Sequence, residues 1–243
     1  GAAQGKNVIL SCKDDRKIYC ISGKGVVMDI RIPSEKDKIQ VKKLWEYCFD
    51  DSPEFVEWFF ENRYKSQYAL ASYDKDNIRS ALQLLPYKIM IRNRQVDTSY
   101  LVGMSTWPQY RGRGDAAALI RQSLKIMHER QEWVSILLPF RYDFYRKYGW
   151  EICYEHLTYR GNNELFTGPG RISGDIIPVS SDNIDILDKC YHEFMQDYNG
   201  YVIRREDDWK RILGDLYVDH GTGYIVFDGA KATGYVLFTI ANR

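Results

Sequence analysis

The chain has 243 residues, of which 44% are hydrophobic and 28% are charged, as in ordinary globular proteins with one large or two small domains. The formal net charge of +1 argues against a protein whose surface is built mainly to bind nucleic acid. No apolar run approaches the ~20 residues that span a bilayer, so we predict no membrane span.

The cysteines are odd in number and scattered, and no two of them form a C-x-x-C pair. This usage fits a reducing cytoplasm and predicts neither a disulfide framework nor a zinc site. We therefore expect a cytoplasmic protein without a bound metal. The five residues are Cys12, Cys20, Cys48, Cys153 and Cys190.

Residues 1–27 differ from the sequence that follows and lack the apolar region and cleavage site of a signal peptide. We interpret them as a leader or tag-derived segment and leave them out of the predicted fold. The regular pattern begins at Met28, and a short strand suits Asp29 to Ile32. Ser34 then caps a helix, with Asp37 three residues on, as in a capping box.

Strand and helix signals alternate after this first helix. Pro53 occupies the first position of a second helix, and Asn93-Arg94 suits a hairpin turn. Pro86 should break or bulge the long strand in which it lies. A helix with one apolar face begins at Asp115, and a short helix over 142–148 is closed by Gly149. The remaining predicted strands cover residues 68–73, 78–91, 95–104, 133–138 and 150–159.

The order of these elements predicts an α/β fold of the α+β kind with a mixed sheet, because three hairpin-like strands precede a helical crossover. A stretch rich in Gly, Asn and Pro over 161–174 is the predicted linker between a first domain, 28–160, and a second, 175–243. Two helices and a hairpin in the second domain repeat the start of the first. We expect this second domain to be partial and truncated, because about 70 residues bury little core.

The run from Leu101 to Ala116 carries the clearest functional signal. A strand ends, a loop with two arginines and two glycines follows, and a helix begins. Free backbone N–H groups, a positive helix end and arginine side chains then meet, which suits a polyphosphate. The alternative is a solvent-exposed arginine turn, and we favour phosphate binding because of the strand–loop–helix context. The candidate residues are Arg111, Gly112, Arg113, Gly114, Asp115 and Ala116.

The segment GMSTWPQYRGRG and its following helix resemble the R/Q-x-x-G-x-G/A acetyl-CoA motif of the GNAT acetyltransferases. FYRKYGWEI, from Phe144 to Ile152, resembles the Y-x-x-[FY]-G-[YFW] segment of the enhanced intracellular survival (Eis) branch. That branch has tandem GNAT-like domains and a sterol-carrier-like domain. The resemblance covers Met28 to Arg243. It implies the GNAT acyl-CoA N-acyltransferase fold, a partial second GNAT-like domain, and acetyl-CoA as co-substrate.

The resemblance also implies roles for individual residues. The pyrophosphate should lie on the N–H groups from Arg111 to Ala116. Tyr145 matches the family's catalytic tyrosine, since a phenol with an ordinary pKa of about 10 can protonate the departing thiolate. Packing in an aromatic-rich helix is the alternative for Tyr145. The strand residues expected beside the pantetheine, where a backbone N–H stabilises the oxyanion, are Met104, Ser105 and Thr106.

Two departures from the family concern the catalytic machinery. Its members are longer and use a chain-terminal carboxylate as general base, which a sequence ending at Arg243 does not supply. Some relatives have a serine near the position of Phe140, which cannot donate a hydrogen bond. A bound water or the missing C-terminus could act as base, because the four histidines occupy no motif. They are His128, His156, His192 and His220.

The expected acceptor pocket borders a cluster of carboxylates and one aromatic residue, which suits a cationic amine. Helix capping explains Asp51 equally well. We predict direct acetyl transfer to a primary amine of an aminoglycoside- or polyamine-like molecule, or to a lysine side chain. A non-catalytic acyl-CoA-binding regulatory or scaffold module is the alternative, and acylation of a protein or of aminoacylated RNA is a third option. The family tends toward homo-oligomers. The cluster comprises Asp50, Asp51, Glu54, Glu57 and Trp58.

Overall fold

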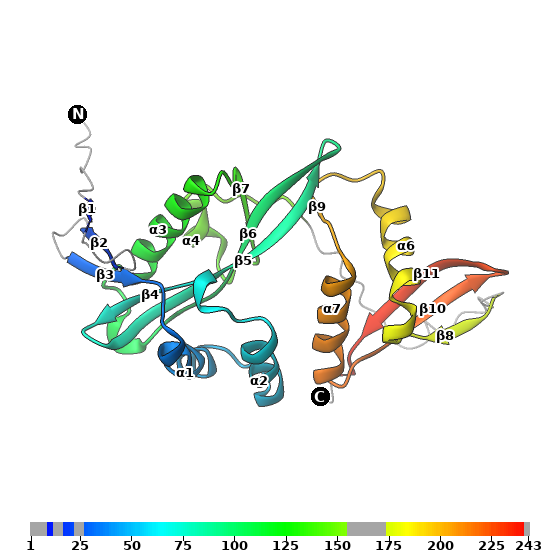
Figure 1. Cartoon of the computed structure of the whole chain (residues 1–243), viewed down its shortest axis with the longest axis horizontal. Coiled ribbons are helices and arrows are strands. Elements are labelled where there is room, and N and C mark those ends of the chain that lie inside the picture. The colour runs from blue at the N-terminus through cyan, green and yellow to red at the C-terminus, as the bar shows by residue number, and fades with distance from the viewer. Residues whose placement is uncertain (1–8, 12–16, 22–26, 155–173, 241–243) are drawn as a thin grey trace. The chain divides into compact units, whose positions relative to one another are not determined.

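The computed structural model describes residues 9–11, 17–21, 27–154 and 174–240. The chain divides into two compact units. Unit 1 is Gly1–Leu138 with Asn199–Ile203, and unit 2 is Pro139–Tyr198 with Arg204–Arg243. Figure 1 labels their helices and strands. Within the described ranges, no helix combines the length and the apolar character that crossing a bilayer requires.

A sheet that has eight strands in the described residues forms the centre of unit 1. Its strands pair antiparallel, except β6 and β7, which run parallel from Thr98↔Val134 to Leu101↔Leu137. The mixed sheet predicted from the order of elements is therefore confirmed. In spatial order the strands are β1 (Ile9–Ser11), β2 (Lys17–Ile21), β3 (Val27–Arg31), β4 (Ala69–Asp74), β5 (Asn77–Ile91), β6 (Arg94–Thr106) and β7 (Val134–Leu137), with β9 (Tyr201–Val202) on β5.

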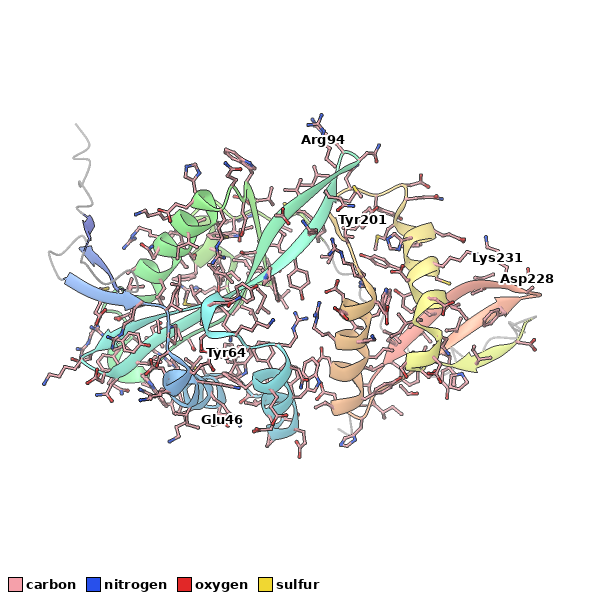
Figure 2. All side chains as sticks on the ribbon, in the orientation of Figure 1. Glu46, Tyr64, Arg94, Tyr201, Asp228 and Lys231 are labelled. Carbon is pink, nitrogen blue, oxygen red and sulfur yellow. The ribbon has the colours of Figure 1, made fainter. Side chains whose placement is uncertain are left out.

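Helices cover both faces of this sheet (Figure 1). α1 (Lys38–Cys48) and α2 (Pro53–Asn62) pack against one face and α3 (Asp115–Glu129) against the other. Successive residues of a strand point to opposite faces. The aromatic core between α1, α2 and the sheet includes Tyr64, which Figure 2 labels. The buried residues of this core are Val41, Leu44, Trp45, Val56, Phe59, Phe60, Tyr64, Ala69, Ala71, Tyr73, Ile78, Ala81 and Leu85.

The predicted helix starts are confirmed, with one change of capping residue. The Ser34 amide donates to the Asp37 carboxylate at 2.9 Å, and one 3-10 turn (Glu35–Asp37) precedes α1. Ser52, not Asp51, caps α2, since its hydroxyl accepts from the Phe55 amide at 3.1 Å. Asp51 instead accepts a bond of 2.7 Å from the Trp45 indole. This carboxylate therefore ties α1 to the turn that follows it.

Pro86 neither breaks nor bulges the strand in which it lies, contrary to the prediction. β5 runs unbroken from Asn77 to Ile91, and Pro86 pairs with Ser99 of β6. On the opposite side of β5, pairing with β4 ends at Gln83 and pairing with β9 begins at Ile89. Proline is tolerated between them because no neighbouring strand needs its missing N–H there.

Two further sequence predictions need correction. β1 and β2 arise from the segment that we set aside as a leader, and they extend the sheet beyond β3. The strand predicted over 150–159 is absent from residues 150–154, and its remainder lies outside the described residues. The predicted hairpin is confirmed, with its turn one residue earlier than predicted. Arg92 and Asn93 form the turn with positive φ, and Arg94 begins β6 at the hairpin tip (Figure 2).

Unit 2 contains α4 (Tyr142–Arg146) and a second small sheet in the order β11-β10-β8. This antiparallel order reproduces that of β5-β4-β3 in unit 1, with two helices again inserted after the first strand. The predicted hairpin around Asp228 is confirmed (Figure 2). The predicted linker over 161–174 lies outside the described residues except for Gly174. The elements are β8 (Ile176–Pro178), α6 (Ile184–Met195), α7 (Glu206–Val218), β10 (Thr222–Asp228) and β11 (Lys231–Phe238).

Candidate functional site

A one-residue bulge interrupts β6 just before the predicted phosphate loop. Val102 pairs with Gln83 and Ser105 with Ala81, so β6 has one residue more than β5 between these pairs. Gly103 has φ +66°, and a Cβ there would lie 2.3 Å from the Trp45 ring. Only glycine fits this close approach. A bulge takes backbone groups out of the ladder, and the predicted backbone donor near Met104 lies at this bulge.

The edge of β6 that faces β7 also changes at this point. The parallel pairing with β7 ends at Leu101, and within the described residues β6 continues to Thr106 without a strand on that side. The Thr106 carbonyl accepts from the Arg111 Nε at 3.1 Å. Met104, Ser105 and Thr106, the predicted pantetheine residues, therefore lie together on a strand end that diverges from its neighbour.

The hydroxyls of two of these residues contact the neighbouring strand β5. Ser105 is buried, and its hydroxyl lies 3.5 Å from the Ala81 carbonyl oxygen. The Thr106 hydroxyl lies 2.7 Å from that of Ser80. Their hydroxyls are thus engaged, and the Ser105 and Thr106 carbonyl oxygens accept from the Ser80 hydroxyl and the Arg111 Nε. Binding of a ligand by the backbone of β6 stays a prediction.

The glycine loop, residues 107–114, joins β6 to α3. Gly112 has φ +73° and Gly114, the N-cap of α3, has φ +94°. The first bond within the helix runs from the Ala118 amide to the Gly114 carbonyl. The N–H groups of residues 115–117 therefore have no acceptor inside the helix, and the positive end of the helix dipole lies with them. Such an arrangement suits an anion, and the phosphate site stays a prediction.

The charged residues of the loop differ sharply in exposure. Arg111 and Arg113 are exposed, and the Arg113 guanidinium lies 5.5 Å from the Tyr110 ring centre. The Asp115 carboxylate is buried and accepts from Ser72 and Arg79, both at 2.8 Å. Asp115 can therefore offer a ligand only its backbone N–H. Sequence reasoning missed Ser72 and Arg79, which carry no motif.

Tyr145, the predicted general acid, lies in α4 of unit 2 and is buried. Its ring meets those of Phe140, Phe144 and Trp150 edge-on, at centre distances of 5.6, 5.1 and 6.2 Å. These contacts belong to the packing alternative. The role of Tyr145 as general acid stays a prediction.

The carboxylate residues of the predicted acidic cluster are all exposed, and two of them have a partner. Asp51 is bonded to Trp45, as described above, and Glu57 pairs with Lys42. Asp50 and Glu54 are exposed and remain the candidates for meeting a cationic amine. In the described part of the chain, no three His, Cys, Asp or Glu side chains group closely enough to hold a metal ion.

Tyrosines on the α1–α2 face do not provide the missing general base. Burial raises the pKa of Tyr64 to about 12, and burial also raises the pKa of Tyr100. Both phenols stay protonated near neutral pH. A base for the amine must come from elsewhere, and water stays the candidate.

Gln83, opposite the β6 bulge, is a buried residue that sequence reasoning did not single out. It is 1% exposed, and neither atom of its amide has a hydrogen-bond partner among the described residues. Its strand neighbours Ala69 and Val102 are apolar. Leaving a buried amide unpaired costs about 1–3 kcal/mol.

We expect Gln83→Met to raise the free energy of unfolding by about 1 kcal/mol, because methionine has a similar shape and no polar group to desolvate. Thermal denaturation should show a melting temperature about 2–4 °C higher. Gln122 is the control, since it is also buried but does interact with a neighbour, so Gln122→Met should destabilise. A lower melting temperature for Gln83→Met would contradict the expectation.

Comparison with known proteins identifies the family of this chain. The family model described as an acetyltransferase (GNAT) domain matches residues 29–153, just over half of the chain. No curated protein matches the sequence. Many solved structures share the fold.

One is a conserved protein of unknown function, a probable N-acyltransferase, from Enterococcus faecalis, with a TM-score of 0.69 and 21% identity over 89% of this chain and 56% of that one. Eis1 from Mycobacterium abscessus has a TM-score of 0.60 and 17% identity, and the match covers 87% of this chain and 52% of Eis1. Saccharomyces cerevisiae N-myristoyltransferase with bound myristoyl-CoA has a TM-score of 0.55 and 12% identity, and the match covers 96% of this chain and 62% of that protein. The chain thus spans little more than half the length of these proteins.

At such identities the likeness concerns the fold alone, whereas the family match rests on the sequence from β3 to α4 and includes the glycine loop. The parallel pair β6–β7, the bulged β6 and the glycine N-cap of α3 lie within that match. The chain belongs to the GNAT acetyltransferase family.

Proposed function

We propose that the chain transfers the acetyl group of acetyl-CoA to a primary amine by direct attack in a ternary complex. The observation that carries this proposal is the glycine N-cap of α3, where the N–H groups of residues 115–117 have no acceptor inside the helix and Arg111 and Arg113 are exposed nearby. A CoA diphosphate is the anion that such a site suits in this family. The bulge at Gly103 then lies one short loop away, where the thioester would reach.

In the proposed reaction the neutral amine attacks the thioester carbon and the carbon–sulfur bond breaks. A backbone N–H at the β6 bulge stabilises the oxyanion of the tetrahedral intermediate, which is worth a few kcal/mol in comparable sites. Tyr145 gives its proton to the departing thiolate, and water takes the proton that the product nitrogen loses. The acceptor is a small cationic amine or a lysine side chain, which Asp50 and Glu54 would attract.

We further infer that residues 175–243 are a partial second GNAT-like domain. The equal strand order of β11-β10-β8 and β5-β4-β3 supports this interpretation. We also expect the protein to form a homo-oligomer and to be located in the cytoplasm.

Release of free thiol from acetyl-CoA tests the enzyme against its alternative, a non-catalytic acyl-CoA-binding module. The chain is assayed with polyamines, aminoglycosides and a lysine peptide, against a reaction without amine, while calorimetry measures CoA binding. Amine-dependent thiol release supports the acetyltransferase. CoA binding without release with any acceptor favours the binding module, and the absence of both overturns the proposed site.

A further inference from the structure

Arg79 in β5 has a main-chain position that anchors the start of the glycine loop. Ser72 of β4 pairs with Ser80 and Tyr73 with Ile78, so Arg79 is the extra residue of a second bulge. Its carbonyl oxygen accepts from the Trp107 amide at 3.0 Å, one bond beyond the last pair of β5 with β6, Ser80 and Thr106. Trp107 is the first residue after β6, and this bond fixes where the loop departs from the sheet.

The side chain of Arg79 anchors the other end of the loop. Its Nη2 lies 2.8 Å from Oδ2 of Asp115, the first residue of α3. The two side chains are 14% and 0% exposed. Ser72 donates to the second carboxylate oxygen at 2.8 Å. The first turn of α3 is thereby held against β4 and β5.

The guanidinium also contacts the middle of the loop. Its central carbon lies 4.8 Å from the centre of the Tyr110 ring, a cation–π distance. The Tyr110 hydroxyl lies 3.3 Å from the Asp74 carboxylate. One residue therefore contacts the beginning, the middle and the end of the same loop.

The charge of Arg79 matters as much as its shape. Asp115 places a buried carboxylate within the first turn of the helix that is proposed to receive a diphosphate. An unpaired buried carboxylate is costly, and beside a diphosphate it would repel the ligand. The Arg79 guanidinium balances that charge, so the helix terminus keeps its attraction for anions.

We propose that Arg79 is a positioning residue for the CoA diphosphate: it holds the glycine loop in its anion-binding conformation and cancels the charge of Asp115. It does so without contacting the ligand. The inference rests on the proposed acetyl-CoA site and adds the contacts that keep the glycine loop able to bind a diphosphate. It explains why an acidic residue stands at the first position of a helix that binds an anion.

Calorimetric titration of acetyl-CoA into R79M tests the proposal. We expect Kd to rise about tenfold at unchanged stoichiometry, because the loop loses the contacts that hold it and the Asp115 carboxylate loses the positive charge beside it. A variant that is merely less folded would lose stoichiometry instead. The double variant R79M/D115N should regain part of the affinity, since the repelling carboxylate is gone while the contacts that hold the loop stay lost. R79K should stay within about threefold of the parent chain.

R31M is the matched control. Arg31 is also partly buried on the same sheet, with ion pairs to Asp29 and Asp76 and a cation–π contact of 3.8 Å to Tyr73. It touches no residue of the glycine loop in these contacts, so R31M should bind acetyl-CoA like the parent chain. Should R79M not fold, Y110L removes the middle contact at a half-buried loop position and should raise Kd about threefold.

The outcomes separate this inference from the proposed function. If the parent chain itself binds no acetyl-CoA, the proposed site fails. If the parent binds but R79M and Y110L bind equally well, Arg79 has no positioning role. A double variant no better than R79M would overturn the charge argument.

Discussion

Gly114→Glu should abolish CoA binding, with Kd raised more than about a hundredfold. Gly114 has φ +94°, where an L side chain is strained by about 1–2 kcal/mol. The new carboxylate would stand at the N-cap of α3, where the diphosphate is proposed to lie. Like charges about 4 Å apart repel by roughly 4 kcal/mol at the effective dielectric constant of a protein surface. Calorimetry with CoA measures the loss.

Gly229→Glu separates this effect from general backbone strain. Gly229 has φ +58° in the β10–β11 turn, and a Cβ there would meet nothing within 4 Å. The control variant thus carries the same new charge and a comparable strain, and it should bind CoA normally. Gly114→Ala introduces strain without charge and should fall between the two. Normal CoA binding by Gly114→Glu would mean that the phosphates lie elsewhere.

The glycine loop could be predicted from sequence because its signals are local. A strand end, two glycines and a helix start occur within a dozen residues, and each acts on its own neighbours. The buried network beneath the loop could not be predicted. Arg79 and Asp115 are 36 residues apart, and the bulge that turns Arg79 toward α3 depends on how β4 and β5 pair. Pattern reasoning treats an arginine in a strand as surface.

Pro86 and Asp51 show how tertiary context overrides a residue's usual preference. Proline ordinarily interrupts a strand, yet Pro86 lies between the β4 and β9 pairings of β5 and leaves no ladder bond unmade. Asp51 has the chemistry of a helix cap, yet the Trp45 indole takes its carboxylate and Ser52 caps α2 instead. For Pro86 the extent of the neighbouring strands decides whether the strand continues, and for Asp51 the Trp45 indole decides where the carboxylate bonds.

Tyr145→Phe should lower kcat about a hundredfold while leaving the Kd for acetyl-CoA within about twofold. The variant removes one oxygen from a buried ring, so its edge-on contacts with Phe140, Phe144 and Trp150 persist. Proton transfer by a positioned side chain contributes about 10²–10⁴ to rate. A hydroxyl that donates to the thiolate acts only as the bond to sulfur breaks, which is why kcat and not ground-state affinity should change.

Tyr148→Phe is the matched control for this experiment, because Tyr148 is a half-buried tyrosine just beyond α4, and its ring lies 5.8 Å from that of Phe144. Loss of its hydroxyl should leave kcat unchanged. Equal turnover for the parent chain and Tyr145→Phe would leave Tyr145 as a packing residue. The thiolate would then take its proton from water, and the pH dependence of kcat should show no group with the pKa of a phenol.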